Sequence, residues 1–101
     1  MILKFSELAQ EDLGDIFAYI HETLANPIAA QDITDGILRV AAQLKDFSEL
    51  GPSLASLGSR GQSIRYLLAS NYLIAYVVLP SHVEIVRILY THSDYKRILQ
   101  G

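Results

Sequence analysis

Hydrophobic residues in the first part of the chain recur every three or four positions, which is the spacing of one face of an α-helix. A short apolar segment, residues 1–5, comes before this pattern and predicts a β-strand that ends at Ser6. Because Ser6 is a good N-cap and acidic residues follow it closely, a helix is predicted to begin there. The apolar stripe of this helix is Ala9, Leu13, Ile16, Phe17, Ile20 and Leu24.

A second helix is predicted to begin at the dipeptide Asn26-Pro27, because Asn is a good N-cap and Pro suits the first helical position. Gly51-Pro52 ends this helix, and Gly36 inside it indicates close approach of another backbone. The connection to the first helix is short, so the two helices are predicted to form a hairpin. The apolar seam of the second helix is Ala30, Ile33, Ile37, Val40, Leu44 and Phe47.

The second half of the chain changes to β-branched and aromatic segments separated by two-residue breaks, a pattern typical of β-hairpins. Strands are predicted at residues 63–69, 72–79 and 82–90, after a Ser- and Gly-rich loop over residues 48–62. Both faces of the middle segment are apolar, so we expect this strand at the centre of the sheet, covered on both sides. The alternation of side chains along the strands predicts that Tyr66, Tyr72 and Tyr76 share one face of the sheet.

The predicted order of elements is β-α-α-β-β-β. It describes an α+β fold in which an antiparallel sheet carries the N-terminal helical hairpin on one face. Because the chain has 101 residues, we expect one domain over residues 1–101.

Composition agrees with a folded protein, since 50% of the residues are hydrophobic and 19% are charged. No apolar run is long enough to span a bilayer, and the N-terminus lacks the pattern of a secretion signal, so no membrane association is expected. Cysteine is absent, which excludes disulfides and thiolate chemistry and fits a cytoplasmic location. No set of His, Asp and Glu has metal-ligand spacing, so neither a metal nor another cofactor is expected.

The net charge of −3 is divided unevenly along the chain. Residues 1–50 hold three basic and nine acidic side chains, a balance of −6, whereas residues 51–101 hold five and two, a balance of +3. Nucleic-acid binding proteins usually carry a strong basic surplus, because neutralised phosphates supply most of the affinity. The charge therefore argues mildly against RNA or DNA as the main ligand.

Three strings of the sequence, in this order of elements, carry a family resemblance. They are FSELAQEDLGDIFAYI (5–20), NPIAAQDITDGI (26–37) and SIRYLLASNYLIAYVVLPSHVEIVRILYTHSDY (63–95). The chain resembles, over essentially its whole length, the RelE/ParE superfamily of toxins from bacterial type II toxin–antitoxin modules. The resemblance implies a toxin that inhibits growth, is linked to plasmid stabilization, uses no small-molecule cofactor and is held inactive by a cognate antitoxin protein.

The same resemblance implies one of two targets. RelE-like members cleave mRNA in the ribosomal A site, and ParE-like members poison DNA gyrase without a nuclease centre. Leu73 stands where the RelE-like branch has a sheet arginine, Ile64 and Tyr66 lie near its lysines, and Ser93 replaces its C-terminal arginine. Because RNA cleavage needs cations on the charged phosphorane, these replacements favour a ParE-like toxin that is not an enzyme.

The string ILYTHSD (88–94) departs from the ParE-like ending too, since Tyr90 stands for a His and Ser93 for an Arg, while Asp94 is kept. Two alternatives therefore remain. One is a degenerate, non-toxic family member that acts as a binding module. The other is a ribosome-dependent mRNA endonuclease with a rearranged site, whose catalytic residues would be Arg65, His92 and Tyr95. A simpler interpretation makes His92 a solvated side chain.

Contact with a partner protein is expected at two sheet arginines and at the end of the last strand. These residues are Arg65, Arg87, Tyr90 and Asp94. Each arginine has an alternative role, in which it pairs with Glu84 or an acidic helix residue of its own chain. For Ser93 or Asp94 the alternative is to cap a last helical turn.

Overall fold

The computed structural model describes residues 1–54 and 63–100, so residues 55–62 of the predicted loop lie outside the described part. The elements follow the predicted order, with a short C-terminal helix added. They are β1 (Ile2–Phe5), α1 (Glu7–Ala18), a π-helix (Tyr19–Thr23), α2 (Pro27–Ala42), a 3-10 turn (Gln43–Lys45), β2 (Arg65–Ala69), β3 (Tyr72–Val78), β4 (His82–Tyr90) and α3 (Tyr95–Gln100). No helix of the described residues is both long and apolar enough to cross a membrane.

The four strands form one sheet in the order β1-β4-β3-β2. The expected antiparallel sheet is confirmed for β2, β3 and β4, which follow one another as hairpins. β1 is the exception, because it lies parallel to β4, with Ile2 opposite His82. Parallel neighbours need a long crossover, and the helical hairpin with the two strands after it provides one.

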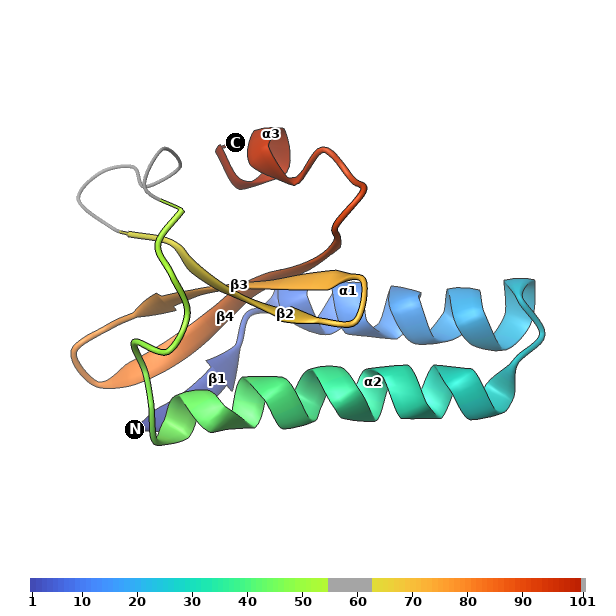
Figure 1. Ribbon diagram of the computed structural model, residues 1–101, viewed down its shortest axis with the longest axis horizontal. Helices are drawn as coiled ribbons and strands as arrows, with labels where there is room; N and C mark the ends of the chain where they lie inside the picture. Colours follow the sequence, from blue (N-terminus) through green and yellow to red (C-terminus); the bar gives the residue numbers. More distant parts are fainter. Residues whose placement is uncertain (55–62, 101) are drawn as a thin grey trace.

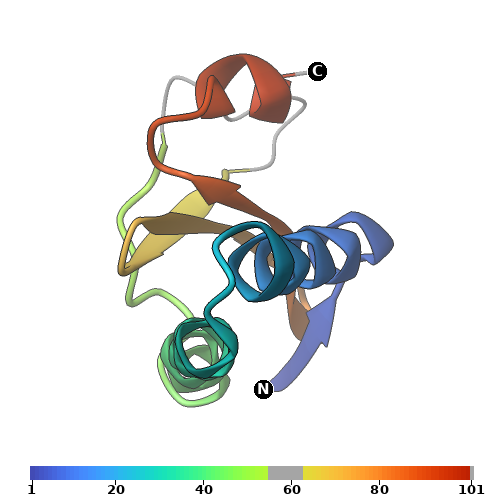
Figure 2. The same cartoon turned by 90° about the vertical axis from the view of Figure 1, so that its right-hand side faces the viewer.

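The sheet lies between two layers of helices. Figures 1 and 2 show α1 and α2 on one face and α3 on the other. The predicted packing of the helical hairpin on one face is therefore confirmed. The central strand is buried along Leu73–Val77, as expected for a strand covered on both sides. The largest fully buried side chains are Tyr76, Ile37, Leu44, Ile74, Ile85, Ile88 and Val83.

Both predicted helix starts are confirmed. The Ser6 hydroxyl accepts a hydrogen bond of 3.0 Å from the backbone N–H of Ala9. The Asn26 side chain accepts one of 3.1 Å from the N–H of Ala29, and Pro27 is the first residue of α2. Each cap satisfies a backbone donor that the first helical turn leaves without a partner.

Two local expectations are wrong. Phe47 lies beyond the last helical turn and is 64% exposed, so it does not belong to the packed seam of α2. Among the described residues, a Cβ on Gly36 would meet nothing closer than 3.8 Å, so none of their backbone approaches it. The close approach occurs at Gly51, where a Cβ would lie 2.1 Å from the backbone oxygen of Tyr66.

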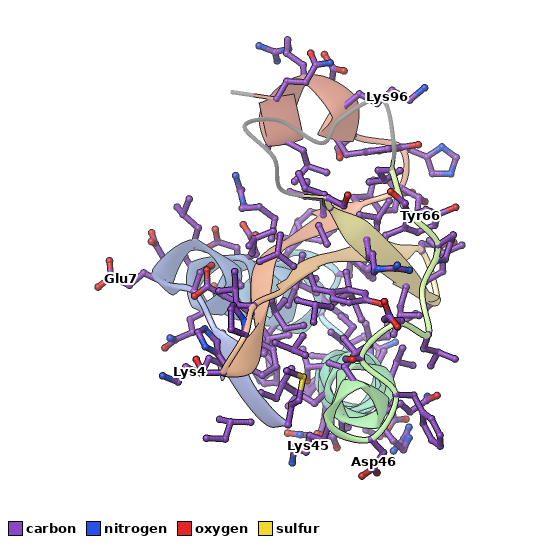
Figure 3. The ribbon with its side chains drawn as sticks, turned by 90° about the vertical axis from the view of Figure 1, so that its left-hand side faces the viewer. Lys4, Glu7, Lys45, Asp46, Tyr66 and Lys96 are labelled. Carbon is purple, nitrogen blue, oxygen red and sulfur yellow. The ribbon has the colours of Figure 1, made fainter. Side chains whose placement is uncertain are left out.

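The predicted common face of the three tyrosines is wrong for one of them. Ala69 pairs with Tyr72 across the two-residue turn, so Tyr66 pairs with Ala75 and points to the face opposite Tyr72 and Tyr76. Figure 3 shows Tyr66 on the side of the sheet that faces α3. Only the hairpin register, which the alternation within one strand does not reveal, decides this orientation.

Candidate partner-binding site

Arg65, at the start of β2, holds the loop segment that contains Glu49 and Gly51 against the sheet. Its Nη1 donates a hydrogen bond of 2.8 Å to the carbonyl oxygen of Gly51, and its Nη2 lies 3.6 Å from a carboxylate oxygen of Glu49. Beside it, the Tyr76 hydroxyl accepts a hydrogen bond of 2.9 Å from the N–H of Gly51. Burial raises the pKa of Tyr76, although the bond from Gly51 opposes this rise. Arg65 is thus engaged within its own chain, but its carboxylate partner is Glu49 of the loop and neither Glu84 nor a helix residue, as the alternative role had it.

Arg87 makes a two-pronged ion pair with Asp12 of α1. Its Nε and Nη2 donate to the two carboxylate oxygens at 2.8 and 2.9 Å. The same carboxylate accepts a bond of 2.9 Å from the backbone N–H of Ile88. Asp12 can reach this N–H because β1 ends at Phe5, opposite Ile85, and leaves the rest of the β4 edge uncovered by a strand. The bond to Asp12 raises the pKa of Arg87, so this arginine too is engaged by its own chain.

The residues after β4 form a turn that leads into α3. The backbone N–H of Ser93 donates to the carbonyl of Tyr90, and the carbonyl of Asp94 accepts from the N–H of Ile98. The Asp94 carboxylate accepts a bond of 2.8 Å from Nε of Arg97. Asp94 therefore lies directly before the last helix, as its alternative role requires, but its carboxylate accepts from the Arg97 side chain and from no helix N–H of the described residues. Its side chain stays 62% exposed.

Tyr90 and His92 belong to an aromatic cluster at the end of β4. The Tyr90 ring lies 5.1 Å from the His92 ring and 5.8 Å from the ring of Tyr72, its partner across the sheet. Burial raises the pKa of Tyr72, and the nearby hydroxyls of Tyr90 and Tyr19 add to this rise. Tyr90 is 47% exposed, so the cluster is accessible from solvent.

The structure does not bring Arg65 together with His92. Arg65 pairs with Tyr76, whereas the His92 cluster surrounds Tyr72, four positions away on β3. At about 3.3 Å per residue, the strand positions beside the two groups lie roughly 13 Å apart along β3. Tyr95 is the first residue of α3 and is partly buried. Nor does any group of three or more His, Asp or Glu side chains in the described ranges come together as a metal site.

A groove that the sequence pattern did not indicate lies beside the aromatic cluster. It has a volume of about 630 Å³ and is enclosed by the end of α1, the π-helix, the start of α2 and the turn between β2 and β3. Figure 1 shows why it forms, because the helical hairpin runs past this turn and leaves the sheet behind. We call it the hairpin groove, and its lining residues are Asp15, Ile16, Tyr19, Ile20, Leu24, Asn26, Ala29, Ile33, Ser70, Asn71, Tyr72 and Tyr90.

The hairpin groove combines an apolar lining with a single charge. Ile20 is buried, whereas Tyr19 and Leu24 are each 54% exposed on its rim. Asp15 is the one charged residue of the lining, and its carboxylate makes no hydrogen bond or ion pair with any residue that the structure describes. Such a surface suits the docking of a partner better than acid–base chemistry.

One signal for this groove is present in the element lengths. α2 has 16 residues and β2 has 5, which correspond to about 24 Å of helix and about 17 Å of strand. A helix that is longer than its neighbouring strand leaves part of its apolar face without a sheet to cover it. The exposed Leu24, which the pattern placed in the packed stripe of the first helix, lies at this overhang.

Comparison with known proteins identifies the family. A family model described as "ParE toxin of type II toxin-antitoxin system, parDE" matches residues 3–95. The chain belongs to the ParE toxin family. The family match confirms the predicted membership of the RelE/ParE superfamily, and the chain is a type II toxin component. A comparison with curated proteins returned no match.

A solved structure supports the fold of this ParE-family toxin independently. It is titled "Chromosomal ParDE TA system from P. aeruginosa" and superposes with a TM-score of 0.64 at 23% sequence identity. The match covers 89% of this chain and 95% of that chain. The α+β arrangement is thus shared over nearly the whole of both chains, and the predicted fold class is confirmed.

Proposed function

We propose that this ParE-family toxin is a cytoplasmic growth inhibitor that a cognate antitoxin holds inactive, and that its target is a protein, DNA gyrase, and not mRNA. The observation that carries the choice of target is the position of Arg65. This arginine is bound to Gly51 and Glu49 and lies at the other end of the sheet from His92. The family supports the role of toxin, and the family's type II systems support an antitoxin partner.

RNA cleavage requires an acid, a base and cations within hydrogen-bond reach of one phosphate, which means separations of about 3 Å from the reacting atoms. Arg65 does not support this requirement, because its strand position lies roughly 13 Å along β3 from that of the His92 cluster and its guanidinium is held by the Gly51 carbonyl. The position that carries a sheet arginine in RelE-like toxins is the buried Leu73. A toxin that acts by binding a protein needs no such assembly.

Expression of the chain without its antitoxin tests the proposal. We expect growth arrest and loss of DNA supercoiling by purified gyrase, with cellular mRNA left intact. Co-expression of the protein encoded beside this gene is expected to restore growth. His92→Ala and Tyr95→Phe are expected to leave growth arrest unchanged, because neither residue carries chemistry in a gyrase inhibitor. Urea unfolding of both variants controls for loss of the folded protein.

Two results would replace this function with its alternatives. Cleavage of mRNA on translating ribosomes that disappears in His92→Ala would make the chain an endonuclease. Normal growth at a confirmed level of folded protein would make it a binding module that has lost toxicity. In both cases the family membership would stand, because it rests on the match over residues 3–95.

A further inference from the structure

A tight turn after the end of α2 exposes two large apolar side chains. The N–H of Leu50 donates to the carbonyl of Phe47 at 3.1 Å, so these residues are the two ends of one turn, with Cα atoms less than about 7 Å apart. Phe47 is 64% exposed and Leu50 is 48% exposed. We call residues 47–50 the apolar turn. Neighbouring exposed apolar side chains mark an interaction surface, whereas single ones need no explanation.

Both ends of the apolar turn are fixed to the fold. At its start, the N–H of Phe47 donates to the carbonyl of Gln43 at 3.0 Å. Directly after it, the N–H of Gly51 donates to the Tyr76 hydroxyl at 2.9 Å, and the Gly51 carbonyl accepts from Arg65 at 2.8 Å. Because the turn is already held in one conformation, binding of a partner costs little additional conformational entropy. The apolar turn is therefore preorganised as a binding element.

The position of the apolar turn determines which kind of partner it suits. It lies at a corner of the molecule, where the chain leaves α2 and turns back toward the sheet (Figure 1). Side chains that project from a corner need a concave site to enter, as anchor residues do at the centre of protein interfaces. Folded domains form such apolar pockets, whereas a single helix or extended segment offers side chains but no pocket. The apolar turn therefore suits a folded protein, which is the class of target proposed above.

The charges beside the apolar turn indicate the chemistry at the rim of that pocket. Asp46 is exposed directly before the turn, and its carboxylate makes no hydrogen bond or ion pair with any residue that the structure describes. Figure 3 shows Asp46 at the end of α2, with the Lys45 side chain lying apart from it. Glu49 lies within the turn and is 77% exposed, and its ion pair with Arg65 is long, at 3.6 Å. Two exposed carboxylates favour lysine or arginine on the partner.

We infer that the apolar turn is the surface by which the toxin contacts its target, with Phe47 and Leu50 inserted into an apolar pocket of gyrase whose rim carries lysine or arginine. The inference rests on the proposed function, since it assigns the proposed target to a place on the toxin. The hairpin groove lies at the other end of α2 (Figure 1). Ala29 of its lining and Lys45 before the turn are about 24 Å apart along the helix, so substitutions in the turn leave the groove unchanged.

The test measures binding of purified toxin variants to immobilised gyrase holoenzyme by surface plasmon resonance, together with inhibition of DNA supercoiling. Phe47→Ala is expected to weaken binding at least about tenfold, and Leu50→Ala roughly threefold to tenfold, because each removes an apolar anchor. Asp46→Asn is expected to slow association by about twofold to fivefold and to reduce its dependence on salt, because it removes a charge from the interface rim. The toxin concentration that halves supercoiling activity is expected to rise in the same order.

Two matched substitutions control for exposure and charge. Ile28→Ala truncates a side chain that is 76% exposed at the start of α2, at the opposite end of this helix from the apolar turn. Asp32→Asn removes an exposed carboxylate of α2 that makes no ion pair with a described residue. Both controls are expected to bind gyrase within about twofold of the unchanged toxin, because they lie outside the proposed interface. Urea unfolding of every variant controls for loss of the folded protein.

Each other outcome overturns the inference in a distinguishable way. If gyrase binds all the variants as tightly as the unchanged toxin, the target contacts another surface and only the assignment of the apolar turn fails. If gyrase neither binds nor is inhibited by any form of the toxin, the proposed target fails together with the inference. If Phe47→Ala weakens binding of the protein encoded beside this gene but not of gyrase, the apolar turn belongs to the antitoxin interface instead.

Discussion

Replacing Asp12 with alanine removes three interactions from one point of the fold. The carboxylate of Asp12 accepts two hydrogen bonds from Arg87 at 2.8 and 2.9 Å and one from the N–H of Ile88 at 2.9 Å. The side chains of Asp12 and Arg87 are 12% and 25% exposed, so the pair lies between a buried and a surface ion pair. Loss of one partner costs about 3–5 kcal/mol in a buried pair and about 0–1 kcal/mol on a surface. We expect Asp12→Ala to lower the free energy of unfolding by roughly 3 kcal/mol.

The measurement is urea unfolding followed by circular dichroism, with Asp15→Ala as the matched control. Both substitutions replace an aspartate of α1 by alanine, so they gain the same helix propensity. Asp15 is exposed and its carboxylate bonds to none of the described residues, so its removal is expected to change the free energy of unfolding by less than about 0.5 kcal/mol. Equal unfolding free energies for the two variants would refute the reasoning, because the ion pair would then contribute nothing to stability.

Two further predictions concern the segment that Arg65 and Tyr76 hold against the sheet. Gly51→Ala is expected to lower the free energy of unfolding by more than about 2 kcal/mol, because its Cβ would lie 2.1 Å from the backbone oxygen of Tyr66. Gly14→Ala is the control, because a Cβ there would have no described neighbour within 4 Å, and it is expected to raise the free energy of unfolding by roughly 0.5–1 kcal/mol. A change of the same sign in both variants would contradict this account. Tyr76→Phe is expected to cost about 1–3 kcal/mol, because the buried N–H of Gly51 loses its acceptor, against less than about 0.5 kcal/mol for the exposed Tyr90→Phe. Since burial raises the pKa of Tyr76 above 10.0, its contribution is complete below that pH and is lost as the pH rises further. In Tyr76→Phe the alkaline loss of stability is therefore expected to be shallower, and an unchanged pH profile would count against the buried hydroxyl.

The local elements were predictable because their signals are contained in a few neighbouring residues. Ser6 and Asn26 cap their helices through their own side chains, and Pro27 suits only the first turn. The two-residue breaks between the last three strands led directly to their antiparallel pairing. The sequence pattern did not predict pairings between segments that lie far apart along the chain, such as the parallel contact between β1 and β4.

The errors have a common physical cause, which is that a sequence pattern does not show where the neighbouring element ends. Phe47 continues the spacing of the α2 seam, but the helix stops before it and the side chain is exposed. Leu24 continues the stripe of α1, but the sheet does not extend beneath it. The second case leaves a groove, so one failure of the pattern coincides with a candidate functional surface.

The candidate site could be predicted only in part for a related reason. Tyr90, His92 and Asp94 were correctly placed at the end of the last strand, since a hydrophobic run ends there in the sequence. The engagement of Arg65 and Arg87 within the chain depends on Glu49 and Asp12, which lie far away along the sequence. An arginine on a strand looks the same whether its carboxylate comes from its own chain or from a partner.

Asp12 and Asp15 illustrate this limit most sharply. They lie three positions apart on α1, so they project from neighbouring parts of one helix face, about 4.5 Å apart along its axis. At Asp12 this face passes the edge of β4 and the carboxylate finds Arg87 and Ile88. One turn later β4 has ended at Tyr90, and Asp15 lines the hairpin groove instead. Two residues of the same type on the same face therefore differ in role only because a strand stops between them. A stabilising effect that Asp12 shows and Asp15 lacks would be the experimental sign of that boundary.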